Sequence, residues 1–508
     1  MAKHVLFIYP NFMIETKHIK TFLGNYYEGV AILAGTLKLS NHQCSLYHLT
    51  WMPSKEEFIN QIKQFKPDII GFTVRTSIMD CVTEMLAWLD DELPDIPVIC
   101  GGYHPTLAPE AVIKTKGVDM VCIGEGERQL RKLVDHFDKT GEFDDTTESF
   151  WFKKEDGTIK RNKVHPYVSN LDELPFPDLD LFNFDNLSVT KVHEMDVIVS
   201  KGCLYACTYC SNANIRKVYE EHKGYARFRS PENAVKYLEM ILEKQPGIQY
   251  IAFNDAILNM YEDWFYEFMD LYKKRINKKF TCNLRFDHMD EKMCKVLAQN
   301  GCYKVTIGLE QGNEEFRSKY LLRNMKNDNI IRVSKMLREQ GIPVITYNIV
   351  GLPHETLKLS LETIKLNAKL HADNILCNNF IPYPGTELRR IAKEGGFLIE
   401  NVKDSDEIRL KMPDYPTNQV LFVKYSFLKL VKRYRKIFNI EDKEKAAKKE
   451  AKLDKWLTSK FYPHTLVYWY NRNTMVWAVE IRRIIKEIMP NLYCKLRDIK
   501  YKKALNSK

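Results

Sequence analysis

The sequence predicts an α/β protein with three parts. Residues 1–150 are expected to form a doubly wound, Rossmann-like sheet, residues 195–400 a partial (β/α)6 barrel of the TIM type, and residues 401–508 a helical region, with residues 151–194 as a linker. Three observations support this fold class. Short apolar runs alternate with helical segments in the first two parts, three closely spaced cysteines lie near the start of the second, and the strand pattern stops near residue 400.

The first part contains five short apolar runs that we expect to be parallel strands. Helical segments of about 10 to 20 residues separate most of them, a spacing typical of a doubly wound sheet. Two glycine-rich runs, Gly101-Gly102-Tyr103-His104 and Gly124-Glu125-Gly126-Glu127, follow the fourth and fifth strands. Glycines at such turns let the backbone approach a bulky ligand closely. The five strands are expected at residues 5–9, 44–47, 69–74, 98–100 and 120–123.

The central part contains six further strand candidates, which fit an open barrel of six strand-helix units. Helices are expected between them, for example over residues 230–243, where Ser230 is a favourable N-cap and Pro231 suits the first helical position. In parallel barrels, ligands bind at the carboxyl ends of the strands. The six strands are expected at residues 196–200, 250–254, 280–286, 304–309, 344–350 and 374–381.

Three cysteines, Cys203, Cys207 and Cys210, have the spacing C-x-x-x-C-x-x-C. This spacing lets three thiolates converge on one [4Fe-4S] cluster, and the fourth iron then keeps open positions for a small molecule. Structural zinc is the alternative, although a zinc site usually adds a fourth Cys or His at short spacing. The chain has 12 cysteines in all, and we expect the others to be core residues, since no second C-x-x-C spacing occurs.

With these cysteines, the central part resembles the radical S-adenosylmethionine enzymes. The resemblance implies that Tyr209 lies against the adenine of S-adenosylmethionine and that Asp255 binds its amino group. It places Glu310 and Gln311 at the ribose, and Ile349 and Gly351 beside the adenine. Glu355, which follows the fifth barrel strand, is also expected to bind S-adenosylmethionine. A carboxylate after a strand is just as often a helix N-cap or first-turn residue, and this alternative holds for Asp255, Glu310 and Glu355.

The first part, joined to the cysteine motif through Leu174-Pro175-Phe176-Pro177-Asp178, resembles the cobalamin-binding class of this family. The family's frequent Asp-x-His-x-x-Gly motif, whose histidine ligates cobalt, does not occur. The resemblance therefore implies cobalamin without a lower histidine ligand, although some members have lost the cofactor. The implied contacts are Thr73, Thr76 and Ser77 on the lower face, together with Gly101, Gly102, His104, Gly124 and Glu125 in the glycine-rich loops.

The resemblance implies an enzyme that cleaves S-adenosylmethionine reductively to a 5′-deoxyadenosyl radical. The expected outcome is cobalamin-dependent methylation of an unactivated carbon in a lipid, a glycan precursor or a specialised metabolite. Radical cyclisation, rearrangement or coupling remain alternatives, as does a cobalamin-binding sensor with a regulatory cluster. An external one-electron donor such as flavodoxin or ferredoxin is expected, and the oxygen-sensitive cluster favours a reducing, cytoplasmic location. Tyr347, Asn348, Asn378 and Asn379 are candidates for the substrate cavity or for barrel packing.

The last part carries the positive charge of the chain. Residues 421–508 hold 23 Lys and Arg against 8 Asp and Glu, a net charge of +15, whereas the whole chain carries +10. Aromatic residues in the runs 461–470 and 475–477 lie among these basic residues. Such a composition fits either a peripheral contact with the inner face of a membrane or a helical lid on the barrel. No apolar stretch is long enough to span a bilayer, and the helical tail argues against nucleic acid as a partner.

Overall fold

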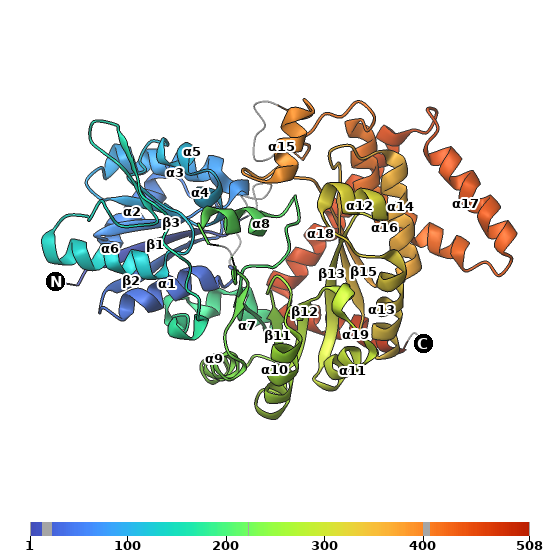
Figure 1. Ribbon diagram of the computed structural model, residues 1–508, viewed down its shortest axis with the longest axis horizontal. Coiled ribbons are helices and arrows are strands. Elements are labelled where there is room, and N and C mark those ends of the chain that lie inside the picture. Colours follow the sequence, from blue (N-terminus) through green and yellow to red (C-terminus); the bar gives the residue numbers. More distant parts are fainter. Residues whose placement is uncertain (1, 13–22, 222, 400–406, 507–508) are drawn as a thin grey trace.

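Two largely parallel sheets lie side by side, each covered by helices, and four long helices follow at the end of the chain on the side of the second sheet (Figure 1). The computed structural model describes residues 2–12, 23–221, 223–399 and 407–506. The predicted α/β class and its three parts are confirmed. The expected boundary at residue 400 lies outside the described residues.

The N-terminal sheet has the strand order β2-β1-β3-β4-β5-β6-β7. The first five strands are parallel, and the order 2-1-3-4-5 is one of the two common doubly wound orders. Strand β1 shows why helices cover both faces of the sheet. Val5 and Phe7 pack on one face with α1 and α6, and Leu6 and Ile8 pack on the other with α2 and α3. The elements are β1 (His4–Pro10), α1 (Glu28–Lys38), β2 (Gln43–Leu49), α2 (Lys55–Phe65), β3 (Ile69–Thr73), α3 (Met79–Glu92), β4 (Val98–Gly101), α4 (Tyr103–Leu107), α5 (Pro109–Ile113), β5 (Met120–Cys122) and α6 (Glu127–Thr140).

An antiparallel hairpin extends this sheet beyond residue 150. It consists of β6 (Phe150–Lys153) and β7 (Ile159–Arg161), and β6 pairs with β5. The turn between them contains Asp156 and Gly157, and Gly157 has a φ of +79°, which favours glycine. The hairpin therefore occupies part of the range 151–194 that the sequence analysis treats as a linker.

The central sheet has the order β8-β11-β12-β13-β14-β15, so each parallel strand pairs with its neighbours along the chain. β8 and β15 are both edge strands, and the barrel is open between them. β14 agrees with its predicted range, and the other predicted strands overlap the observed ones. The elements are α7 (Ser188–Val192), β8 (Glu194–Val197), β9 (Ser200–Lys201), α8 (Ser211–Ile215), β10 (Arg227–Phe228), α9 (Pro231–Lys244), β11 (Tyr250–Phe253), α10 (Glu262–Arg275), β12 (Lys279–Asn283), α11 (Glu291–Gln299), β13 (Cys302–Glu310), α12 (Glu314–Leu321), α13 (Asn327–Glu339), β14 (Val344–Val350), α14 (Leu357–Leu370), β15 (Asn374–Asn379) and α15 (Glu387–Glu394).

Helix α9 begins as its sequence predicts. The Oγ of Ser230 accepts a hydrogen bond from the backbone N–H of Asn233 at 3.2 Å, and Pro231 occupies the first turn. Such a cap stabilises a helix by about 1 kcal/mol, because it satisfies an N–H that has no partner inside the helix. The local signals in this segment are therefore sufficient to start the helix.

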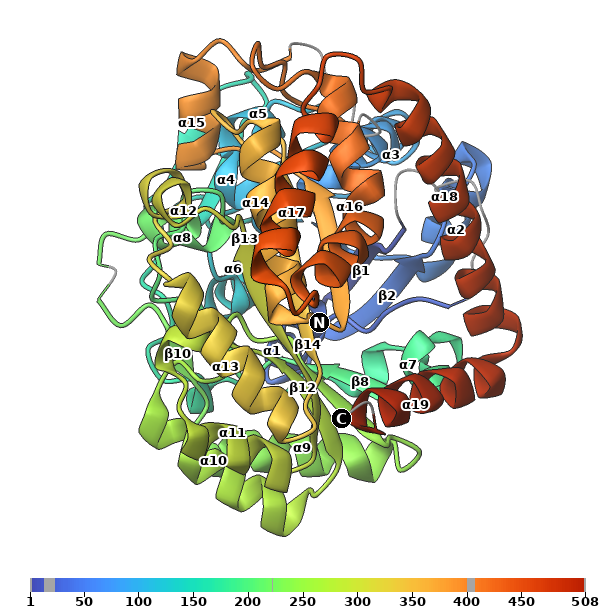
Figure 2. The ribbon, with the colours of Figure 1, turned by 90° about the vertical axis from the view of Figure 1, so that its right-hand side faces the viewer.

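The C-terminal region consists of α16 (Thr417–Phe438), α17 (Lys443–Leu457), α18 (His464–Ile488) and α19 (Pro490–Asn506). Helix α16 packs against α14 and β15, whereas α18 contacts α16 near one end and α7 near the other. Figure 2 shows α18 running between these two regions, with α19 beside α7. The C-terminal helices thus connect the surroundings of both edge strands of the open barrel. Among the described residues, no helix is long and apolar enough to cross a membrane.

Candidate functional site

The three cysteines lie in the loop between β9 and α8, close to the carboxyl end of β8. Cys207 is buried, and Cys203 and Cys210 are half-buried. The loop is anchored to α12, since the Oγ1 of Thr208 donates to the carbonyl of Tyr320 at 2.5 Å. Gly202, with a φ of +82°, must be glycine because a Cβ there would overlap the carbonyl oxygen of Tyr225. These contacts fix both ends of the cysteine loop.

The chemistry of this donor set fits an iron-sulfur cluster. Burial, together with the nearby thiols of Cys207 and Cys203, raises the pKa of Cys210 to about 11. Within the described ranges, no three His, Cys, Asp or Glu side chains converge as the ligands of a single metal ion do. A zinc ion usually takes four Cys or His ligands, whereas a [4Fe-4S] cluster can be held by three thiolates, which is the number that this loop supplies.

Two buried arginines flank the cysteine loop. Nη1 of Arg323 lies 3.9 Å from Sγ of Cys207, and the guanidinium of Arg285 lies 3.5 Å from the ring centroid of Tyr205 within the loop. Nε of Arg323 and Nη1 of Arg285 have no hydrogen-bond partner among the described residues. Sequence reasoning missed Arg323, since an isolated arginine after a helix carries no spacing signal. Arg323 thus supplies a positive charge and a free N–H donor beside the thiolate of Cys207.

Asp255 and Glu310 are buried carboxylates at the ends of β11 and β13. Oδ1 of Asp255 accepts hydrogen bonds from the Oγ of Ser200 and, at 2.9 Å, from the N–H of Val199, whereas Oδ2 has no partner among the described residues. Burial raises the pKa of Asp255 to about 6, although these hydrogen bonds oppose the shift. Burial also raises the pKa of Glu310, against the effect of Arg323 and the hydroxyl of Tyr209. Tyr209, Glu310 and Arg323 therefore form one group next to the cysteines.

Gln311 and Glu355 are engaged in holding the backbone. Nε2 of Gln311 donates to the carbonyl of Leu359 at 2.9 Å, and its Oε1 accepts from the N–H of Asn313. The carboxylate of Glu355 accepts from the N–H of Gly351 at 2.8 Å, from a second N–H and from the Oγ of Ser360. Burial raises the pKa of Glu355 to about 7. Both side chains thus shape the turns in which they lie.

The two remaining residues that were predicted beside the adenine lie at the end of β14 and in the turn that follows it. Gly351 has a φ of +77°, and Ile349 is half-buried on β14. The four candidates for the substrate cavity lie on β14 and β15, where successive side chains point to opposite faces of the sheet. Tyr347 and Asn378 are exposed, whereas Asn348 is buried and donates to the carbonyl of Leu376 at 3.0 Å. Asn379, which is half-buried, donates to the carbonyl of Glu407 at 3.0 Å, so the exposed pair alone faces open space.

A cavity of about 380 Å³ lies between the N-terminal sheet and the start of the barrel. Its inner wall is apolar, with side chains from β1, α1 and α6. Five of the eight residues predicted to contact cobalamin line it: Thr73, Gly101, Gly102, Gly124 and Glu125. A Cβ added to Gly101 would lie 3.7 Å from Cβ of Cys122, so the absence of a side chain here leaves room rather than avoiding a clash. An apolar cavity lined by glycines fits part of a bulky cofactor.

The other three predicted cobalamin residues do not line this cavity. Nδ1 of His104 lies 3.1 Å from Oγ1 of Thr76, and burial lowers the pKa of His104, which favours the neutral imidazole. Ser77 is exposed in a short 3-10 turn beside Thr76. The structure thus brings Thr76, Ser77 and His104 together next to the cavity rather than inside it.

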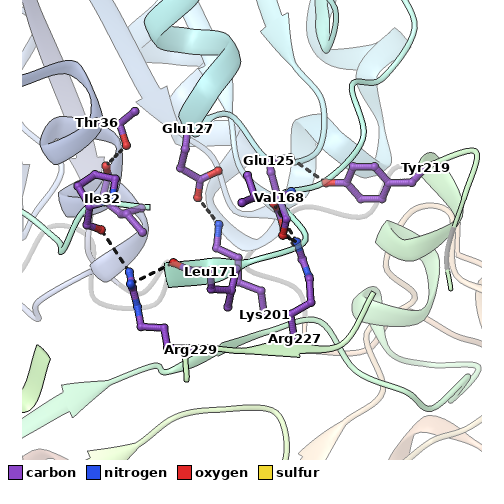
Figure 3. A network of polar contacts seen from close by, with 11 residues as sticks. Ile32, Thr36, Glu125, Glu127, Val168, Leu171, Lys201, Tyr219, Arg227 and Arg229 are labelled. Carbon is purple, nitrogen blue, oxygen red and sulfur yellow. Dashed lines mark hydrogen bonds and ion pairs between the residues drawn. The ribbon is translucent and has the colours of Figure 1, made fainter. Parts of the chain in front are cut away.

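A network of ion pairs joins the N-terminal domain to the barrel (Figure 3). Glu127 pairs with Lys201, which lies two residues before Cys203, and Glu125 pairs with Arg227 at 2.5 Å. The N–H of Glu125 also donates to the hydroxyl of Tyr219 at 2.8 Å. Burial opposes the ionisation of Glu125, but Lys201 and Arg227 outweigh it and lower its pKa. Sequence reasoning found Glu125 but neither of its cationic partners, because they are distant along the chain.

Comparison with known families agrees with this arrangement. Residues 197–366 match the radical SAM superfamily, and residues 27–134 match the B12 binding domain. The uncharacterized methyltransferase PH0819 of Pyrococcus horikoshii is 27% identical over 341 residues, which cover 66% of this chain and 72% of that protein. The anaerobic magnesium-protoporphyrin IX monomethyl ester cyclase of Rubrivivax gelatinosus is 26% identical over 400 residues, covering 76% and 69%. The cytidylyl-2-hydroxyethylphosphonate methyltransferase of Streptomyces wedmorensis is 22% identical over 335 residues, covering 59% and 60%.

Two solved structures share the fold. The cobalamin-dependent S-adenosylmethionine radical enzyme OxsB, with aqua-cobalamin and S-adenosylmethionine bound, superposes with a TM-score of 0.67 at 18% identity, covering 99% of this chain and 83% of that one. The methyltransferase TsrM of Kitasatospora setae, with cobalamin and a [4Fe-4S] cluster bound, gives 0.62 at 17% identity, covering 78% and 75%. The match to OxsB extends over the C-terminal helices, which the sequence analysis could not assign. The chain therefore combines a radical SAM domain with an N-terminal B12 binding domain.

Proposed function

We propose that this protein is a cobalamin-dependent radical methyltransferase that acts on an unactivated carbon of a small or lipid-like molecule. With its cofactors bound, the site would supply reductive cleavage of S-adenosylmethionine to a 5′-deoxyadenosyl radical, together with a methyl group carried by cobalamin. The observation that carries the proposal is the position of the cysteine loop, which lies beside the cavity that joins the two domains. A radical formed there would arise next to both the B12 domain and the open barrel.

The protein's own residues would bind and orient the cosubstrate. Oδ2 of Asp255 is a buried acceptor without a partner among the described residues, which suits the amino group of S-adenosylmethionine. The free Nε of Arg323 suits a carboxylate, and Tyr209 lies near both Arg323 and the cysteines, where its ring suits the adenine. Gln311 and Glu355 would act indirectly, because their polar groups already hold the turns around the site. In the proposed site, Glu310 contacts the ribose, and Ile349 and Gly351 lie beside the adenine.

In the B12 domain, we propose that Thr73, Gly101, Gly102, Gly124 and Glu125 contact cobalamin within the cavity. The pair of His104 and Thr76, with the adjacent Ser77, would lie at the edge of the corrin. Because its Nδ1 is paired with Thr76, the role of His104 in this proposal is to position the loop rather than to ligate cobalt. A one-electron donor such as flavodoxin or ferredoxin and a reducing, cytoplasmic location complete the proposal.

The formation of 5′-deoxyadenosine tests the proposed chemistry. Protein reconstituted with iron and sulfide without oxygen is expected to release 5′-deoxyadenosine from S-adenosylmethionine when dithionite or reduced flavodoxin is added, as measured by chromatography and mass spectrometry. Release of 5′-deoxyadenosine in the absence of a reductant would indicate that S-adenosylmethionine is not cleaved reductively. If no reductant yields the product while the cluster is intact, a sensor with a regulatory cluster becomes the better interpretation. The relatives named as a cyclase and as methyltransferases support both radical cyclisation and methyl transfer as outcomes.

The exposed apolar surface of α18 and α19 supports a lipid-like substrate. Between its contacts with α16 and α7, α18 is exposed on all sides over Met475, Val476, Trp477 and Val479, and Trp477 alone is 71% exposed. A helix that is apolar all round is normally buried, and one that combines apolar, aromatic and basic residues is typical of a membrane interface. The lid hypothesis does not account for these residues, because their side chains are largely exposed rather than packed on the barrel. We propose that this surface, the α18 patch, contacts anionic lipid.

Vesicle binding tests the α18 patch. Full-length protein is expected to sediment with vesicles of phosphatidylglycerol and phosphatidylcholine and to be released by salt, which screens the basic residues. Replacing both Val476 and Trp477 by serine is expected to lower the vesicle-bound fraction at least about fivefold, since the buried apolar area falls. The matched control is Trp456→Ser on α17, which is also an exposed tryptophan but lies outside the patch. Equal binding by the wild type and the double variant would contradict the lipid contact.

A further inference from the structure

The contact between the two domains is centred on one short ribbon that leads into the cysteine loop. Strand β9 (Ser200–Lys201) pairs with β10 (Arg227–Phe228), and in this register Lys201 lies directly opposite Arg227. Like charges opposite each other on a ribbon repel and destabilise it. The ribbon has only two residues on each strand, so it has few other contacts to offset this repulsion.

Two carboxylates of the B12 domain neutralise this pair of cations. Glu127 bonds Lys201, and Glu125 bonds Arg227, and both acids belong to the loop Gly124-Glu125-Gly126-Glu127 (Figure 3). The side chains of Glu127 and Lys201 are 6% and 27% exposed, so the pair is shielded from solvent. Removing one partner of such a pair is costly, because the other charge stays buried without a counterion. The conformation of the ribbon therefore depends on the loop of the other domain.

The same loop faces the cavity of the B12 domain. Gly124, Glu125, Gly126, Glu127 and Lys201 all line the cavity. Oε2 of Glu127 is buried and has no hydrogen-bond partner among the described residues. It is an acceptor available to a ligand in the cavity, and cobalamin carries several amide groups that donate hydrogen bonds. Oε1 of Glu127 thus binds Lys201, next to the cysteine loop, and Oε2 is available to a ligand in the cavity.

We propose that the ion pairs Lys201–Glu127 and Arg227–Glu125 couple the two cofactor sites, so that cobalamin binding and cluster loading each strengthen the other. This inference rests on the proposed function, since it requires both cofactors to bind. When Cys203 ligates a cluster, Lys201 two residues earlier is held in place, and Glu127 is then fixed in the orientation that presents Oε2 to the cavity. Ordering the Gly124–Glu127 loop around cobalamin in turn fixes the ribbon that leads into the cysteines. Thermodynamic linkage makes the two effects equal in size.

The affinity for hydroxocobalamin with and without the cluster measures this coupling. The dissociation constant is determined anaerobically, by absorbance titration, for protein with a reconstituted cluster and for protein stripped of iron. In the wild type, we expect the cluster to tighten cobalamin binding about tenfold, within the usual range of coupling between two sites. In Lys201→Met and in Glu127→Gln, the ratio of the two constants is expected to fall to within about twofold of unity. Lys201→Arg, which keeps the charge, is expected to retain most of the coupling.

A matched control and a second measurement separate coupling from general damage. Glu110→Gln breaks the ion pair with Arg161 in the same domain; neither residue lines the cavity, and the variant is expected to leave the ratio unchanged. Cobalamin is also expected to slow the loss of iron to a chelator in the wild type but not in Lys201→Met. A wild-type ratio of one, or an unchanged ratio in both Lys201→Met and Glu127→Gln, overturns the inference while leaving cobalamin binding and 5′-deoxyadenosine formation intact. Absence of cobalamin binding in every form overturns both the inference and the proposed cofactor role.

Discussion

Cys207→Ala protein, purified and reconstituted without oxygen, is expected to hold no [4Fe-4S] cluster and to form no detectable 5′-deoxyadenosine. Cys207 is the most buried of the three cysteines, and the anchored turn around Thr208 places it beside Arg323. Only Cys203 and Cys210 then remain of the motif, so the cluster loses one of its three thiolate ligands. We expect turnover to fall by more than about a hundredfold, since even residues that only orient a ligand cost 10-fold to 100-fold.

Iron and sulfide analysis, together with electron paramagnetic resonance of the reduced protein, measures this loss. The control is Cys44→Ala, which removes a half-buried thiol on β2, far from the cysteine loop in the sequence, and is expected to keep its full iron content. Arg323→Gln is expected to have an iron content between those of these two variants, because it removes a charge beside Cys207 but no ligand. If the Cys207→Ala protein retained its cluster and its turnover, the three-cysteine site would be wrong.

Gly101→Leu is expected to weaken cobalamin binding by about tenfold to a hundredfold, because inserting a side chain into a filled site costs about 1–3 kcal/mol. Gly101 ends β4 and lines the cavity, and its φ lies outside the region that requires glycine. A leucine there can extend into the space that the cofactor would occupy, with no strain in the backbone. The melting temperature of the protein without cobalamin is therefore expected to change little.

Titration with hydroxocobalamin and thermal unfolding are the two measurements. Gly101→Ala serves as the graded control, since its Cβ would make an ordinary contact 3.7 Å from Cβ of Cys122 and should cost much less affinity. Unchanged affinity in Gly101→Leu, with the protein folded, would show that cobalamin does not enter this cavity. A large fall in melting temperature would instead mean that the leucine disrupts the sheet itself.

The strands and the cysteine motif could be predicted because their signals are local. Residues 5–8 alternate between the two faces of β1, and such apolar runs indicate a buried parallel strand without knowledge of its partners. The C-x-x-x-C-x-x-C spacing likewise brings three thiolates together within one loop. Gly351 with its positive φ, and Ser230 as an N-cap, are set by the conformation of their own turns.

The surroundings of other residues could not be predicted from their neighbours in the sequence. Gln311 and Glu355 follow strands, as ligand-binding residues do, but their polar groups are engaged by the backbone of adjacent turns. Arg323 and Lys201 carry no motif of their own, and they gain a role only from Cys207 and Glu127, which lie far away along the chain. The hairpin β6–β7 was missed because its strands are short and the pairing of β6 with β5 has no local sequence signal.

The sequence by itself determined the alternation of strands and helices, the three-thiolate motif and the glycines at strand ends, since backbone geometry and side-chain spacing act over a few residues. Only the tertiary structure decided which carboxylates remain free, where the cavity lies and how the B12 domain is joined to the cysteine loop. Those features depend on contacts between segments separated by many residues, and such contacts form only when the two sheets pack against each other.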